Sequence, residues 1–303
     1  MNNNETTEPL IKLKGVGKSY QHFELADVDL SLEQGCVMGF IGPNGAGKST
    51  TIRMIMGLIK ADRGDVEVLG VPMPERMADA KWDIGFASED MRLFKNGTLA
   101  WHMNFMRRIY PRWDDNYAQV LLKRFDLRQE QKLKGFSHGQ RVKAGLLLAL
   151  ARRPKLLVLD EPTTGLDPVA RKEVLNELLE VLADERRAVL FSSHNTQDVE
   201  QLSDMITFID RGRIIDSQDK ETFLDKWRRV RFRAADEIRE EDLTGVVEFH
   251  HRGQLGSVVT DRFEPAMTER LTHLGAEVQD VEPMTLEEIF VAEVEASREE
   301  VLL

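Results

Sequence analysis

A glycine-rich segment between an apolar strand and an amphipathic helix constrains this chain most. Residues 36–41 form a continuous apolar run, and isoleucines spaced over 52–59 predict a helix with one apolar stripe. In this context glycines let backbone N–H groups face an anion, and the helix N-terminus adds partial positive charge. We expect a nucleotide phosphate-binding loop in which Lys48 reaches the β- and γ-phosphates and Ser49 ligates Mg²⁺. The predicted loop reads Gly42-Pro43-Asn44-Gly45-Ala46-Gly47-Lys48-Ser49-Thr50.

Two adjacent carboxylates follow another apolar strand. Residues 156–159 are all apolar and lead directly to Asp160 and Glu161. Charges at the end of a buried strand are costly unless they meet a metal ion or a water molecule. Together with the phosphate-binding loop, they predict that Asp160 holds Mg²⁺ and that Glu161 is the general base for an attacking water.

The order of apolar runs predicts an α/β fold, and the phosphate-binding loop after residues 36–41 makes its core similar to that of the P-loop NTPases. Residues 156–159 and 188–191 predict strands separated by a helix over about 169–183, an alternation typical of a parallel sheet covered by helices. Residues 11–16 alternate like an edge or half-exposed strand. Between about 91 and 134 the pattern is helical and aromatic, which predicts a helical insertion.

Length and charge narrow the class of protein further. The 303 residues allow one α/β core plus a smaller domain. A net charge of −11 argues against a nucleic-acid partner, because phosphate-backbone binding needs a basic face. The longest apolar stretch, 144–151, is too short for a membrane span. Cys36 is the single cysteine, which fits a reducing cytoplasm, and residues 1–8 are predicted to be disordered without a secretory signal.

A change of pattern near residues 221–228 predicts a domain boundary. We expect a small C-terminal α+β domain over 223–303. Its strands are predicted at 230–233 and 246–249, and its helices at 268–274 and 286–294. A packing or dimerisation module and a ligand-sensing module are both open interpretations of this domain.

The order of the remaining motifs resembles that of the ATP-binding-cassette (ABC) family. Ser137-His138-Gly139-Gln140 precedes a helix, Gly165-Leu166-Asp167 follows Glu161, and Ser192-Ser193-His194 ends the next strand. The family places its Walker A loop, Q-loop, signature motif, Walker B strand, D-loop and switch histidine in this order. The resemblance covers about residues 10–220 and implies an ABC ATPase domain over 9–222, with a helical subdomain at about 91–152.

The resemblance implies further site residues and a second subunit. Tyr20 would stack on adenine, with Phe23 as a possible substitute, and His194 would hydrogen-bond the γ-phosphate. In this family ATP is sandwiched between two cassettes, so a homodimer or a related partner cassette is expected. The signature and D-loop residues that would join the nucleotide-binding set are Ser137, Gly139, Gln140 and Asp167.

Two residues depart from the family pattern. His138 stands where a glycine is usual, and a non-glycine residue held at positive φ would cost about 1–2 kcal/mol. Either the backbone does not need that conformation, or the site is weakened. Glu89 stands where the Q-loop usually has glutamine. It would either act on Mg²⁺ and the catalytic water, while adding negative charge beside the triphosphate, or be a solvated loop acid.

The resemblance also implies a biological role. An ABC cassette without a membrane span would be the ATP-hydrolysing subunit of a transporter, held on the cytoplasmic face of the membrane by a separate permease. Residues 283–290 are similar to a segment that follows the cassette in bacterial ABC-2-type exporters. Trp101, Phe105 and Tyr110 would either line a groove for a permease helix or belong to the core.

Two alternative functions are weaker. A soluble ABC ATPase that acts on ribosomes or DNA usually has two cassettes or a long coiled coil in its chain, and neither is seen. A GTPase-like switch would need an Asn-Lys-x-Asp motif, which is absent. Nothing in the cassette identifies a cargo, because cargo selection would lie in the permease.

Overall fold

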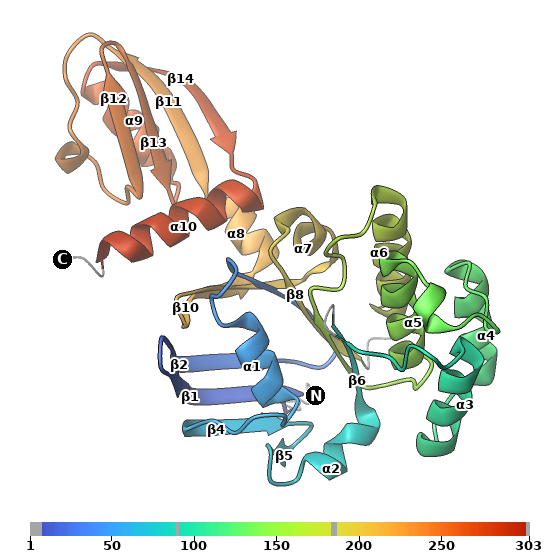
Figure 1. Ribbon diagram of the computed structural model, residues 1–303. Helices are drawn as coiled ribbons and strands as arrows, with labels where there is room; N and C mark the ends of the chain where they lie inside the picture. The colour runs from blue at the N-terminus through green and yellow to red at the C-terminus, as the bar shows by residue number, and fades with distance from the viewer. Residues whose placement is uncertain (1–7, 89–90, 183–186, 301–303) are drawn as a thin grey trace, which may run out of the picture. The chain divides into compact units, whose positions relative to one another are not determined.

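The computed structural model of the chain describes residues 8–88, 91–182 and 187–300. These residues form two compact units, one up to Asp216 and one from Ser217 (Figure 1). The predicted disorder of residues 1–8, apart from Glu8, and the predicted role of Glu89 fall outside the described residues.

Two β-sheets organise the first unit. The larger sheet has the order β10-β9-β3-β8-β7-β6, and its strands β9, β3, β8, β7 and β6 run parallel to one another. Its strands are β3 (Val37–Ile41), β6 (Ile84–Ser88), β7 (Leu156–Asp160), β8 (Ala188–Ser193), β9 (Met205–Asp210) and β10 (Arg213–Asp219). The central strands β3 and β8 are buried along their whole length. This explains their continuous apolar sequences, since both faces of a parallel sheet are covered.

The second sheet is antiparallel, with the order β2-β1-β4-β5. Its strands are β1 (Ile11–Tyr20), β2 (Phe23–Leu32), β4 (Arg63–Val68) and β5 (Val71–Pro72). Burial alternates at the start of β1, as predicted for a half-exposed strand. The edge position is wrong, because β1 pairs with β2 on one side and β4 on the other.

Helices cover the parallel sheet and form the predicted insertion. No strand lies between β6 and β7 in the described residues, which there form α3, α4 and α5. Thr98 and Asp114 cap the N-termini of α3 and α4 by accepting backbone hydrogen bonds, and both helices pack on α5. The helices of this unit are α1 (Lys48–Ile55), α2 (Met77–Ala80), α3 (Leu99–Ile109), α4 (Asp115–Arg124), α5 (His138–Leu150), α6 (Pro168–Leu182) and α7 (Thr196–Leu202), with short 3₁₀ turns η1 (Lys81–Asp83) and η2 (Leu133–Gly135).

The second unit is a four-stranded antiparallel sheet with helices, as predicted for an α+β domain. The strand order is β12-β13-β11-β14, and Val230 and Phe232 of β11 lie in its own apolar core with Val258 and Leu271. Its elements are α8 (Lys220–Lys226), β11 (Arg228–Ala234), η3 (Glu240–Asp242), β12 (Glu248–Arg252), β13 (Leu255–Thr260), α9 (Pro265–His273), β14 (Ala276–Pro283) and α10 (Leu286–Glu300).

Across the described ranges, every helix falls short of the length and apolar character that a bilayer crossing requires.

Candidate active site

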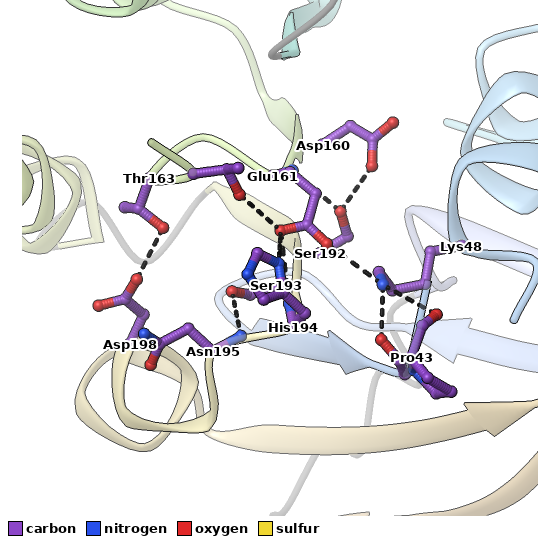
Figure 2. Close-up of polar contacts among 12 residues, drawn as sticks. Pro43, Lys48, Asp160, Glu161, Thr163, Ser192, Ser193, His194, Asn195 and Asp198 are labelled. Carbon is purple, nitrogen blue, oxygen red and sulfur yellow. Dashed lines mark hydrogen bonds and ion pairs between the residues drawn. The ribbon is translucent and has the colours of Figure 1, made fainter. Parts of the chain in front are cut away.

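Three neighbouring strands bring the predicted catalytic side chains to one edge of the parallel sheet. β3, β8 and β7 are adjacent and parallel, so their carboxyl ends point the same way. Asp160 ends β7, Glu161 and His194 directly follow β7 and β8, and Lys48 begins α1 after the loop that leaves β3. Figure 2 shows Lys48, Glu161 and His194 pointing toward one another.

The glycine-rich loop needs glycine at specific positions. A Cβ atom at Gly42 would lie 2.3 Å from the Ile209 carbonyl oxygen of β9, so the loop can only approach that strand without a side chain. Gly47, which precedes α1, has φ of 117°, a left-handed conformation that favours glycine. The middle of the loop, Asn44 and Gly45, is exposed, while Ser49 and Thr50 lie partly buried in the first turn of α1. This leaves the loop open to an anion from solvent.

Lys48 lies between this loop and Glu161. Its ammonium group donates a hydrogen bond of 2.6 Å to the Gly42 carbonyl and lies 3.4 Å from that of Pro43. It is also 3.2 Å from Glu161 Oε1, an ion-pair distance without hydrogen-bond geometry. The side chain is only 6% exposed, so a positive charge is held beside the phosphate-binding loop with little solvent screening.

The Glu161 carboxylate is oriented from its other oxygen. Oε2 accepts hydrogen bonds from His194 Nδ1 at 2.7 Å and from Thr164 Oγ1 at 3.0 Å. Glu161 has φ of 52°, which is strained for a non-glycine residue, yet its N–H donates to both the carbonyl and hydroxyl oxygens of Ser192. The chain therefore turns sharply after β7, and Oε1 keeps capacity to accept a proton from water.

Asp160 and Ser49 supply the oxygen atoms that Mg²⁺ prefers. Asp160 Oδ1 accepts a hydrogen bond of 2.7 Å from Ser192 Oγ, which fixes the carboxylate. No group of three His, Cys, Asp or Glu side chains that could hold a metal occurs in the described part of the chain. Mg²⁺ is commonly held by one or two protein oxygens plus substrate phosphates and water, so this small donor set fits the ion.

Tyr20 and Phe23 lie at the turn between β1 and β2, and they are not equivalent. Tyr20 is 50% exposed, and its ring centroid is 6.4 Å from that of Phe23. Phe23 packs on the loop, because its Cζ lies 3.1 Å from the position of a Cβ on Gly47. The exposed ring of Tyr20 is thus the one available for stacking on a base.

The signature segment begins α5 with a reciprocal cap. Ser137 Oγ accepts from the Gln140 N–H, and Gln140 Oε1 accepts from the Ser137 N–H. His138 is the first residue of the helix and does not have positive φ, so the cost of replacing a glycine there does not arise. Its Nε2 lies 2.9 Å from the Thr164 carbonyl. A Cβ on Gly139 would meet its nearest neighbour at 3.5 Å, so this chain's own packing does not require glycine there.

The structure brings together only part of the predicted set. Within the described residues, no hydrogen bond or ion pair joins Ser137, Gly139, Gln140 or Asp167 to Lys48, Glu161 or His194. Asp167 instead caps α6 through the Val169 and Ala170 N–H groups, which lower the pKa of its carboxyl group, that of Ala170 most.

Sequence reasoning gave no role to two polar residues near the site. Ser192 touches Asp160 and Glu161 at once, and only its position two residues before His194 hinted at this. Asp198 of α7 is 1% exposed and accepts from Thr163 Oγ1 at 2.7 Å and Arg171 Nε at 2.6 Å. It therefore links α7, the loop after Glu161 and α6, and no motif signalled its burial.

Known proteins resemble this chain in sequence and fold. Residues 25–164 match the family model described as ABC transporter. The bacitracin transport ATP-binding protein BcrA of Bacillus licheniformis is 36% identical over 213 residues, covering 69% of this chain and 68% of BcrA. The daunorubicin resistance ATP-binding protein DrrA3 of Streptomyces coeruleorubidus is 31% identical over 300 residues, covering 93% and 94%. A solved ATP-binding subunit of an ABC transporter aligns with a TM-score of 0.64 and 27% identity, over 69% of this chain and 90% of that one.

Proposed function

Because the chain belongs to the family of ABC transporter ATP-binding proteins, we propose that it powers an ABC-2-type exporter by hydrolysing ATP. Membership of an ABC ATPase family accounts for ATP binding and hydrolysis. The exporter role is supported by relatives named for bacitracin transport and daunorubicin resistance. We assign the choice of transported substrate to the permease and not to the cassette.

One observation carries the catalytic part of this proposal: the Glu161 carboxylate lies between Lys48 and His194. Backbone N–H groups of the loop and Lys48 hold the phosphates, and Tyr20 stacks on adenine. Glu161 takes a proton from water as the water oxygen attacks the γ-phosphorus and the bond to the bridging oxygen breaks. His194 keeps Glu161 oriented and can donate a hydrogen bond toward the γ-phosphate. Mg²⁺, held by Ser49 and Asp160, would neutralise developing charge on the phosphates.

A second cassette completes the proposed site. In the described residues, no hydrogen bond or ion pair joins Ser137, Gly139, Gln140 or Asp167 to the Lys48 and Glu161 pair, although the family uses these residues on nucleotide. Packing within this chain does not require glycine at Gly139. A glycine at such a position supports the close approach of a ligand there. These residues serve the nucleotide bound by the partner subunit, which is either a second copy or a related chain.

A separate permease is the proposed membrane partner, and it would hold the cassette on the inner face of the membrane. Trp101 and Phe105 of α3 are each 49% exposed and stack with ring centroids 5.6 Å apart, which favours a binding surface over a core position. They line a groove of about 500 Å³ with residues of β6 and α5. A permease helix is the occupant we propose. Ribosome or DNA binding is less compatible with the net charge of −11.

The variant Glu161→Gln tests the catalytic assignment. ATP binding should be retained, while phosphate release should fall by about 10²–10⁴-fold, because the amide cannot accept the proton. Radiolabelled ATP binding and phosphate release measure the two effects. Glu75→Gln, which removes an exposed carboxylate paired with Lys60, is the matched control and should hydrolyse ATP normally. Wild-type hydrolysis by Glu161→Gln would remove Glu161 as the base.

Co-purification tests the permease. Detergent extraction of membranes from cells that make the tagged chain should recover a multi-span protein with it. Recovery with ribosomes, and not with a multi-span protein, would favour the alternative of a soluble ABC ATPase.

A further inference from the structure

Among the residues that the structure describes, the charged side chains lining the groove between α3, α5 and β6 are all cationic. Its charged lining residues are Lys81, Arg92 and Arg152, and no acidic side chain lies among the lining residues that the structure describes. This contrasts with the chain as a whole, in which 52 acidic residues outnumber 41 Lys and Arg. A groove that is apolar and cationic within an acidic protein has a specific electrostatic preference.

Arg152 is the buried member of this set. It is 7% exposed, and its guanidinium carbon lies 3.4 Å from the centroid of the Tyr110 ring. One terminal nitrogen donates to the Lys81 carbonyl at 2.7 Å. The Nε atom is buried and has no hydrogen-bond partner among the described residues. A buried cationic donor without an acceptor is costly. The Nε–H group of Arg152 is therefore available to donate a hydrogen bond to an oxygen atom of a ligand.

Asp83, the neighbouring acidic residue, is not the acceptor for Arg152 Nε. Asp83 binds Arg112 and lies 3.1 Å from Lys155 Nζ, and it makes no hydrogen bond with Arg152. Burial lowers the pKa of Arg152, consistent with a guanidinium whose charge is incompletely compensated. Lys81 and Arg92 are exposed at the groove and add to the attraction for an anion without supplying an acceptor.

We propose that the groove recognises its permease helix through a carboxylate on the helix's apolar face, which forms an ion pair with Arg152. This inference rests on the proposed function and adds the chemistry by which the partner is selected. An amphipathic helix lays apolar residues against Trp101 and Phe105, and a Glu or Asp one turn away reaches the guanidinium. A charge-assisted hydrogen bond to Nε–H satisfies the unpartnered donor.

This arrangement discriminates between helices that are equally apolar. A helix without an acid fills the groove but leaves Arg152 Nε unsatisfied, and a helix with a basic residue meets three cations. Specificity therefore comes from the cost that wrong partners meet as well as from the pair that the right partner forms. Arg152 is a specificity-determining residue of the docking groove.

Photo-crosslinking in cells that make the full chain and its membranes tests the proposal. Phe105 is replaced by p-benzoylphenylalanine, and the cross-linked peptide is sequenced by mass spectrometry. We expect a segment of a multi-span protein that carries Asp or Glu within about one helical turn of the cross-link. Arg152→Gln, or Gln in place of that acid, should lower the cross-link yield by roughly thirtyfold, the loss expected for truncating one partner of a buried charge pair.

A charge exchange distinguishes recognition from misfolding. Arg152→Glu alone should abolish the cross-link, and combining it with Arg in place of the partner's acid should restore it. Arg108→Gln is the matched control, because Arg108 is an exposed arginine of α3 outside the groove lining. This control should leave the yield unchanged.

The remaining outcomes separate this inference from the proposed function. A cross-link to a multi-span protein that survives Arg152→Gln, that lacks a nearby acid, or that the charge exchange does not restore overturns recognition by Arg152 and leaves the permease intact. A cross-link only to non-membrane proteins, or none while the chain is made and hydrolyses ATP, overturns the permease partner and this inference together.

Discussion

Ser192 holds the carboxylate of Asp160, the proposed Mg²⁺ ligand, in register with Glu161, the proposed general base. Its hydroxyl donates to Asp160 Oδ1 and accepts from the Glu161 N–H, at 2.7 and 3.1 Å. Ser192→Ala should raise the Mg²⁺ concentration for half-maximal ATPase activity by about fivefold, since one hydrogen bond contributes about 1 kcal/mol. A Mg²⁺ titration of phosphate release measures this shift.

Ser193→Ala is the control for that variant. Ser193 is equally buried, but its hydroxyl accepts from the Asn195 N–H and contacts neither carboxylate. Its Mg²⁺ dependence should remain that of the wild type. Equal shifts in both variants would mean that β8 packing, and not the Ser192 bond, positions Asp160.

Site residues could be predicted where a motif specifies both the residue and the group that it contacts. The sequence predicted that Lys48, Glu161 and His194 act together, and the structure places them in contact. No role was predicted for Ser192, because its contact with Asp160 depends on β8 lying beside β7. The order of strands in a sheet does not follow from the local sequence of each strand. The sequence left open whether His138 is held at positive φ. The structure shows that its backbone is helical, so this strain does not arise.

At the scale of elements, Asp198 joins α7 to the loop after β7 and to α6. Asp198→Asn keeps a hydrogen bond available to Thr163 but leaves Arg171 without its carboxylate. The free energy of unfolding should fall by about 3 kcal/mol, as for the loss of one partner from a buried ion pair. Urea unfolding measures the change. Adding Arg171→Met should recover part of the loss, and simple additivity of the two variants would argue against direct coupling.

The stability that the first turn of α10 contributes to the fold should decrease at acidic pH. The Thr285 N–H and then Arg229 lower the pKa of Glu288 from its ordinary 4.5 to about 2. A depressed carboxyl pKa stabilises the fold above the unfolded-state value, and this contribution is lost as pH falls from about 4.5 toward 2. Glu288→Gln should therefore lower the thermal midpoint at pH 6, and this deficit should be much smaller near pH 2.5, where only part of the contribution is left.

Glu287→Gln is the neighbouring control for this acid effect. Glu287 is exposed in the same turn of α10, so its variant should follow the wild-type pH profile. Thermal unfolding followed by circular dichroism at several pH values compares the three proteins. A Glu288→Gln deficit that stays constant down to pH 2.5 would contradict the carboxylate's role.

Elements with strong apolar patterns were predicted more reliably than their pairing. The strands β7 and β8 agree closely with the apolar runs, because burial on both faces leaves no ambiguity. The place of β1 inside its sheet was missed, since its half-exposed pattern is the same for central and edge strands. β12 begins two residues later than predicted, in a segment of mostly intermediate burial with weak apolar alternation.

At the scale of the whole molecule, we propose an active site shared by two chains, an expectation that came from the resemblance to the ABC family. Lys48 and Glu161 lie together within one chain, whereas in the described residues no hydrogen bond or ion pair links them to the α5 cap at Ser137. A composite site makes the specific activity per chain depend on concentration, because only the dimer hydrolyses ATP. A site complete in one chain would give constant activity on dilution.

Mixing two inactive variants tests the composite site directly. Lys48→Ala removes the phosphate-binding cation, and Ser137→Arg places a long charged side chain at the exposed cap, so each homodimer should be inactive. In a two-fold dimer with random exchange, half of the dimers are mixed and each holds one intact site, giving about a quarter of wild-type activity. Phosphate release from the variants, alone and mixed in equal amounts, measures this recovery. A mixture that shows only the average of its components, with Ser137→Arg active by itself, would place the complete site in one chain.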